Sequence, residues 1–319
     1  MNNRQTTGAP PWYRIALTAI GVLCLLGGIA VGALGPAEMY CFYLFSEGGR
    51  FHYEGFGFGS FMFGNIASQI IGYYLIAAIL IPLGYGHLAK RRWVRPLSVA
   101  LLWSWLVVGA PLVVVVFIIL AASKDLTLPA ALAAMALLGL SYLVWPGLAI
   151  RFYQSRRVRQ VFEAQDAEAG WLERRPIPIL VLSALYAFYV VMLHILIMFN
   201  GIYPVFGSFR FGLEGIALLD ISIACLVALV WGTLRQRVWT WWGGVILFGL
   251  FTFSTILTFV RTSYPALLSG LAFPPREIEI LRGVPAQGYH FAILTGIPLV
   301  ITWVVAVLSK RHFSTGIRL

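Results

Sequence analysis

The sequence predicts an all-α integral membrane protein with eight transmembrane helices, arranged as two parallel four-helix repeats with both termini in the cytoplasm. The 319-residue chain is 60% hydrophobic and 11% charged, with mean hydropathy +0.85, whereas a soluble domain carries about 25% charged residues. Two stretches, Phe58-Gly-Ser-Phe-Met-Phe-Gly64 and Phe206-Gly-Ser-Phe-Arg-Phe-Gly212, match at six of seven positions. Basic residues gather in alternate connecting segments. Composition, repeat and charge pattern together define this fold class.

Eight apolar runs are long enough to cross the hydrocarbon core, which takes about 20 helical residues. The first run is too long for a cleavable signal peptide, and Gly35-Pro36-Ala37 is a weak cleavage site, so we expect this helix to be retained. The predicted spans are Ile15–Gly35, Ile66–His87, Leu97–Ala122, Ala130–Ile150, Ile179–Asn200, Leu213–Leu234, Trp241–Val260 and Phe291–Leu308.

The charge distribution sets the predicted topology. With the N-terminus inside, the inner segments hold 17 of the 23 basic residues, which is the positive-inside pattern. We therefore expect a multi-pass protein of the inner, cytoplasmic membrane. Because these basic residues orient the chain and contact anionic lipid headgroups of the bilayer, the net charge of +11 does not indicate a nucleic-acid partner.

The matching stretches lie at an offset of 148 and suggest a duplication. Residues 1–150 form the first predicted repeat, with an aromatic, glycine-rich outer loop at 36–65. Residues 177–319 form the second, with an outer loop at 261–290. Four helices per half is an even number, so the two halves have the same orientation. A basic cytoplasmic linker, 151–176, joins them and contains a polar helix within 158–169 that is expected at the membrane surface.

The outer loops carry two further signals. Ten aromatic residues lie from Tyr40 to Phe63. We expect them to form either an aromatic belt at the headgroups or a cap over an outer cavity. In the last outer loop, Pro274-Pro275 begins and Arg282 ends a short predicted helix.

The cysteines predict no special chemistry. Cys24, Cys41 and Cys225 form no C-x-x-C pair, so they are interpreted as small hydrophobic residues rather than as disulfide or metal ligands.

Asp220 is the first candidate for chemistry, because it lies about two turns inside the sixth predicted helix. A carboxylate at that depth costs free energy unless it is paired, protonated or hydrated. We therefore expect Asp220 either to take part in the protein's function or to hold two helices together by a hydrogen bond. In the repeat alignment Asp220 corresponds to Gly72, so only the second half carries this acid. His194, Asn200 and Glu214 complete a candidate intramembrane polar site.

A second candidate site lies at the outer face. It comprises five polar residues of the outer segments, which act there as acids, bases or ligand contacts: His52, Glu54, His290, Arg261 and Glu38. Glu38 is expected to follow the first helix directly.

Several chemistries lack their motifs. The sequence contains no P-loop, no H-E-x-x-H and no G-x-S-x-G, and no metal site is expected. A single haem held by His194 and His290 is the one cofactor that the histidines leave open.

Three functions follow from these features. The first is transport or binding of a small solute through an outer-facing polar cavity, supported by the duplication and by Asp220. The second is a non-catalytic subunit that assembles with other membrane subunits, since apolar helices and an aromatic loop suit that role. The third is an outer-face enzyme that acts on a lipid-linked substrate through Glu38, Glu54, His52 and His290.

Overall fold

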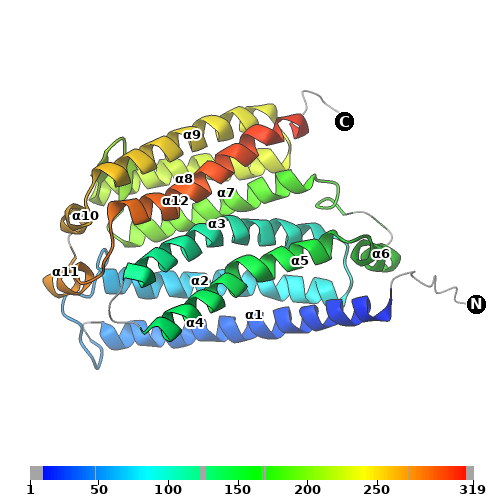
Figure 1. The fold of residues 1–319 in the computed structure, drawn as a ribbon, viewed down its shortest axis with the longest axis horizontal. Coiled ribbons are helices and arrows are strands. Elements are labelled where there is room, and N and C mark those ends of the chain that lie inside the picture. Colours follow the sequence, from blue (N-terminus) through cyan, green and yellow to red (C-terminus); the bar gives the residue numbers. More distant parts are fainter. Residues whose placement is uncertain are drawn as a thin grey trace, which may run out of the picture.

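The computed structural model describes residues 10–46, 48–122, 127–166, 168, 170–271 and 273–313. Eight of its helices are long and apolar enough to cross a membrane, which confirms the predicted class of a multi-pass helical membrane protein. The helices run side by side in one bundle (Figure 1). We call the end that bears the turns 85–94 and 231–240 and the linker 151–176 the basic end. The opposite end, with residues 46, 48–60, 199–211, 262–271 and 273–287, is the loop end.

The spans extend most of the predicted runs by a few residues. They are α1 (Pro11–Phe45), α2 (Phe61–Leu88), α3 (Val94–Ala122), the continuous segment α4 (Leu128–Gly139), η1 (Leu140–Val144) and α5 (Trp145–Gln154), then α7 (Ile177–Met198), α8 (Gly212–Leu234), α9 (Val238–Arg261) and α12 (Gly288–Leu308), which runs into the 3₁₀ turn η2 (Ser309–His312). The π-helical turn η1 ends two residues before Pro146, and the backbone N–H of Trp145 bonds to the Leu140 carbonyl. The wider turn makes room for a proline that lacks an N–H and would crowd the preceding turn.

The first helix does not end at Gly35 as predicted. It continues through Pro36 to Phe45, so Glu38 and Cys41 lie on α1, and the first outer loop shrinks to residues 46–60. Contacts with α2 stabilise this extension: the Tyr74 hydroxyl donates to Met39 Sδ at 3.8 Å, and Phe42 packs edge-on against Phe63. Glycines nearer the start of α1 bring the two helices close. A Cβ at Gly35 would come within 2.6 Å of Tyr74, and one at Gly21 within 2.9 Å of His87. Small residues thus bring the two backbones close, as is common between membrane helices.

The helices pack in the same order in both halves of the chain. In the first half α1 packs against α2 and α3 against α5, and in the second half α7 packs against α8 and α9 against α12. The halves join through α3, which contacts both α7 and α12. Because eight spans return the chain to its starting side, α1 begins and α12 ends at the basic end (Figure 1).

The turn after α2 and the turn after α8 have the same backbone. In the first, the N–H of Arg91 bonds to the Gly86 carbonyl at 2.8 Å and that of Lys90 to the His87 carbonyl at 3.2 Å. Lys90 is left-handed, with φ +51°. This is a Schellman motif, which satisfies the last carbonyls of a helix.

The second turn repeats every feature at an offset of 146. The N–H of Arg237 bonds to the Gly232 carbonyl at 3.0 Å, that of Gln236 bonds to the Thr233 carbonyl at 2.9 Å, and Gln236 has φ +55°. Glycine normally occupies such a left-handed position. Lys90 instead donates from Nζ to Thr18 Oγ1 (2.8 Å), and Gln236 bonds to Arg175 (2.6 Å) and to the His312 carbonyl (2.9 Å). The side chains tie each turn to its neighbours.

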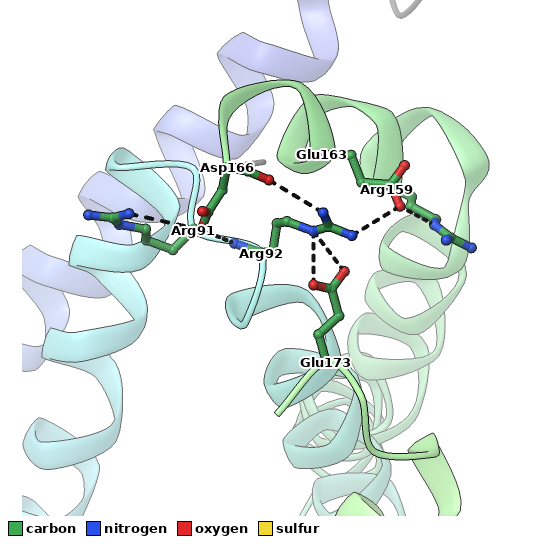
Figure 2. Close-up of polar contacts among 6 residues, drawn as sticks. All are labelled: Arg91, Arg92, Arg159, Glu163, Asp166 and Glu173. Carbon is green, nitrogen blue, oxygen red and sulfur yellow. Dashed lines mark hydrogen bonds and ion pairs between the residues drawn. The ribbon is translucent and has the colours of Figure 1, made fainter. Parts of the chain in front are cut away.

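The linker is attached to the first of these turns. Its helix α6 (Arg156–Gln165) begins at Ser155, whose Oγ accepts from the Val158 N–H, and buries Val158, Val161 and Phe162. Figure 2 shows Arg92 between the linker carboxylates. Arg92 Nε donates to Glu173 Oε1 at 3.0 Å, and its Nη2 lies 3.5 Å from Glu163 Oε1.

The segment after α7 folds into a hairpin that the sequence pattern did not predict. Strands β1 (Tyr203–Val205) and β2 (Ser208–Arg210) pair antiparallel around Phe206 and Gly207. Both turn residues have positive φ, +39° and +102°, as a type I′ turn requires. The turn N–H groups donate to Ser254 Oγ and Thr258 Oγ1 of α9, each at 2.9 Å. Irregular backbone beside a membrane helix is thereby satisfied within the protein.

Candidate functional site

The loop end contains a pocket of about 780 Å³ between the two halves. Three parts of the chain line it: the loop between α1 and α2, the residue Asn200 after α7, and the segment that leads into the start of α11 (Pro275–Arg282). Its polar lining comprises Tyr53, Glu54, Ser60, Asn200 and Arg276, and its apolar lining includes Phe58, Leu271, Phe273 and Pro274. Pockets of 300–1,000 Å³ with a few polar groups on an apolar wall are typical of small-molecule sites.

Two residues with left-handed backbone, Gly55 and Asn200, bring the segments that line the pocket into contact. Gly55, with φ +82°, lies against Pro274, where a Cβ would come within 2.7 Å of the proline ring. Asn200 follows α7 with φ +64° and donates from Nδ2 to the Leu271 carbonyl at 3.3 Å. The first loop is therefore in close contact with the last one, and α7 is hydrogen-bonded to it.

Glu277 follows the lining residue Arg276 and connects the two halves of the chain. It is 3% exposed, and its Oε2 and Oε1 accept from the backbone N–H groups of Phe61 and Met62 at 2.8 and 3.0 Å. Ser60 Oγ accepts from the Phe63 N–H at 3.2 Å. The first donors of α2 thus have partners, and the carboxylate complements the positive end of the helix dipole.

The electrostatics of the pocket are mixed. Glu54 and Arg276 contribute opposite charges on exposed side chains. Burial, followed by the neighbouring Glu277 carboxylate, raises the pKa of the Tyr53 phenol, whereas Arg276 acts in the opposite direction. Tyr53 is therefore a neutral hydroxyl that donates or accepts hydrogen bonds at physiological pH.

The pocket unites only part of the predicted outer-face set. Of that set Glu54 lines it, together with Asn200 of the predicted intramembrane site. His52 is exposed in the first loop, with φ +30°, and Arg261 is exposed beside the hairpin turn, 3.2 Å from a Cβ at Gly207. Glu38 is part-buried along α1. The four residues assigned to the enzyme alternative thus lie in different surroundings.

His290 is buried at the start of α12, with 3% exposure. Its Nδ1 accepts from the Gln287 N–H at 3.0 Å, and its Nε2 has no hydrogen-bond partner among the described residues. His194 is exposed on α7. One imidazole faces the interior and the other the outside of the bundle, so the two do not enclose one haem cavity. In the described part of the chain no group of three His, Cys, Asp or Glu residues forms a metal site.

The remaining intramembrane candidates lie on the outside of the bundle. Asp220 is exposed on α8, and Glu214 is exposed within 3.6 Å of Arg210. An exposed ion pair of this kind contributes little to stability. An ionised aspartate near the centre of a membrane helix costs about 3 kcal/mol on insertion scales. Asp220 does not line the loop-end pocket. The cost of placing it in the membrane needs a separate explanation.

Sequence reasoning did not identify Tyr53, Ser60 or Arg276 as site residues, and it did not predict the contact between Glu277 and α2. A serine directly before an apolar run is an N-cap signal, and it identifies Ser60. The contact between Glu277 and α2 joins residues more than 200 positions apart, so no local signal reveals it.

The bundle and its pocket define the class: a multi-pass membrane protein with a cavity at one end. Comparisons of the chain with protein-family models, with curated proteins and with solved structures find no match.

Proposed function

We propose that the protein binds a small solute with polar and apolar parts in the loop-end pocket. The observation that supports this is the convergence of three distant segments on one cavity of about 780 Å³. Glu54, Asn200 and Arg276 offer an acceptor, an amide and a cation beside the rings of Phe58 and Phe273. This combination suits an uncharged or zwitterionic solute better than one of high net charge.

We also propose that the chain is built from two repeats with a defined orientation in the membrane. Residues 1–150 and 177–319 are two parallel repeats joined by the linker 151–176, a view supported by the equal helix pairing and the equal turns. The basic end lies in the cytoplasm, in the cytoplasmic membrane of the cell, because most Lys and Arg residues gather there. The pocket then opens outward, where it receives solute for binding or for transport.

Ligand binding is tested on the full chain in lipid nanodiscs. Native mass spectrometry identifies small molecules that co-purify, and sugars, amino acids and phosphoalcohols are then titrated in a thermal-shift assay. A true ligand at a hundredfold excess over its dissociation constant stabilises the protein by about 2.7 kcal/mol. If no solute of these classes raises the unfolding temperature, the proposal is wrong.

Variants locate the binding to the pocket. Glu54→Gln and Asn200→Ala should weaken the ligand by about tenfold each, because each removes one polar contact. Glu279→Gln is the matched control, since Glu279 is exposed on the same outer face and does not line the pocket. Equal affinity in all three variants would place the ligand elsewhere.

A further inference from the structure

The exposed face of α8 carries an acid that nothing in the described chain satisfies. Asp220 makes no hydrogen bond or ion pair within the described residues, although it lies well inside a membrane span. Ionisable residues at such depth normally face a protein interior or a partner group. The face around Asp220 therefore requires a cover other than lipid.

The geometry of α8 separates an intramolecular face from a free face. Buried residues follow one another at helical spacing along one side: Gly215, Leu219, Ser222, Leu226 and Leu229. At about 100° per residue, the exposed positions 217, 220, 224 and 231 fall on the opposite side. Ala217 and Ala224 flank Asp220 there. Small residues beside a polar one are typical of a surface against which a second membrane helix packs closely.

The neighbouring helix α7 offers the complementary group. His194 is exposed, and its Nδ1–H donates to the Val190 carbonyl at 2.7 Å. Its Nε2 is thereby left for an outside partner. A carboxyl or carboxylate suits this atom, as a donor to the neutral imidazole or as the counter-ion of the protonated one.

Asp220 and His194 lie at nearly the same depth. The Gly212 N–H bonds to the Asn200 carbonyl at 2.8 Å, so the end of α7 and the start of α8 are level. From that level Asp220 is about 12 Å and His194 about 9 Å along the helix axes. Within one chain the two side chains do not pair, although α7 packs against α8.

We propose that a second copy of this chain covers α8 and that Asp220 of each copy pairs with His194 of the other. Copies in one membrane share orientation and depth, so a two-fold axis along the membrane normal brings groups of equal depth together, and each contact occurs twice. The alanines at 217 and 224 allow the close approach. The proposal is independent of the loop-end pocket.

Cross-linking in native membranes tests the contact without altering its charges. The three native cysteines are replaced by serine, and Ala224→Cys is introduced. Oxidation should give a covalent dimer. Phe253→Cys is the matched control on the exposed face of α9 and should remain monomeric. No dimer at 224, or equal dimer at both positions, would overturn the proposal.

Charge variants test the pairing itself. In mild detergent, Asp220→Ala and His194→Ala should each raise the dimer dissociation constant at least about tenfold, because two interhelical contacts are lost. The exchange variant Asp220→His with His194→Asp should restore the dimer. A monomeric wild type, an exchange variant as weak as the single variants, or a different membrane protein bound at Asp220 would each reject a second copy as the occupant. Helical content by circular dichroism verifies that each variant is folded.

Discussion

The two turns of the basic end differ in sequence but share a backbone, whereas the two matched stretches of the loop end share a sequence but differ in backbone. Residues 86–94 and 232–240 share only four of nine amino acids, yet they have the same hydrogen bonds and the same left-handed position. The stretches 58–64 and 206–212 share six of seven amino acids, yet their backbones differ. Local identity is therefore a poor guide to local conformation in this chain.

The tertiary partners of each stretch explain the difference. In the first, Ser60 caps α2, which begins at Phe61 and receives Glu277 as a second cap. In the second, Ser208 lies in β2, because Ser254 and Thr258 of α9 bind the hairpin turn. The two turns of the basic end share one backbone conformation, whereas the two stretches of the loop end do not, and the pocket lies at the loop end.

The largest expected effect tests whether the two turns are equivalent. A Cβ at Gly86 would overlap Val94 and lie 2.9 Å from Trp93 Cζ2; one at Gly232 would overlap Thr240 and lie 2.8 Å from Trp239 Cζ2. Gly86→Ala and Gly232→Ala should each lower the free energy of unfolding by about 2–3 kcal/mol through overpacking. Denaturant titration in micelles measures this.

Gly139→Ala is the control for these variants. Gly139 has helical backbone angles and open space around its Cβ position, so alanine there should be neutral or stabilising by about 0.5–1 kcal/mol. A large loss at only one of the two turns would break the equivalence.

The next effect tests the cap that distinguishes the first loop-end stretch. Glu277→Ala leaves the N–H groups of Phe61 and Met62 without acceptors, and the free energy of unfolding should fall by about 2 kcal/mol. Glu277→Gln keeps one acceptor and should lose less. Glu279→Ala, on the exposed side of α11, should change stability little, and a Glu277→Ala variant as stable as wild type would refute the capping role.

A smaller effect tests the feature that distinguishes the first basic turn from the second. Arg92 corresponds to Val238 at the offset of 146. Arg92→Val deprives Glu163 and Glu173 of a part-buried partner, and we expect a loss of about 1–2 kcal/mol and faster proteolysis of residues 151–176. Arg91→Val should have almost no effect, since the Arg91 side chain is 50% exposed and 3.9 Å from Asp166. Unchanged proteolysis in Arg92→Val would contradict the attachment of the linker.

The smallest effect compares one substitution at matching positions. Phe206 is left-handed, whereas Phe58 keeps a negative φ. Asparagine tolerates the left-handed region and favours type I′ turns. Phe206→Asn should therefore raise the free energy of unfolding by about 0.5–1 kcal/mol, and Phe58→Asn should give no gain. Equal effects in a thermal-unfolding series would show that the two stretches do not differ as described.

The sequence alone was sufficient for features that depend on composition and local chemistry. The eight spans follow from long apolar runs, because the hydrocarbon core imposes their length. The short helix α11 follows from Pro274-Pro275 and Arg282, and the structure confirms it at Pro275–Arg282. The sequence placed Glu54 in the outer-face set and Asn200 in the intramembrane set, and the fold brings both to one pocket.

Only the tertiary structure decided what depends on distant partners. Lys90 and Gln236 are left-handed although neither is a glycine, so no local pattern predicts these turns. Their side chains bond to distant residues, namely Thr18, Arg175 and His312. Phe206 enters a hairpin turn because α9 binds that turn. Glu277 caps α2, and Asp220 faces outward, because of how whole helices pack. Such contacts join residues far apart in the chain, and apolar periodicity carries no information about them.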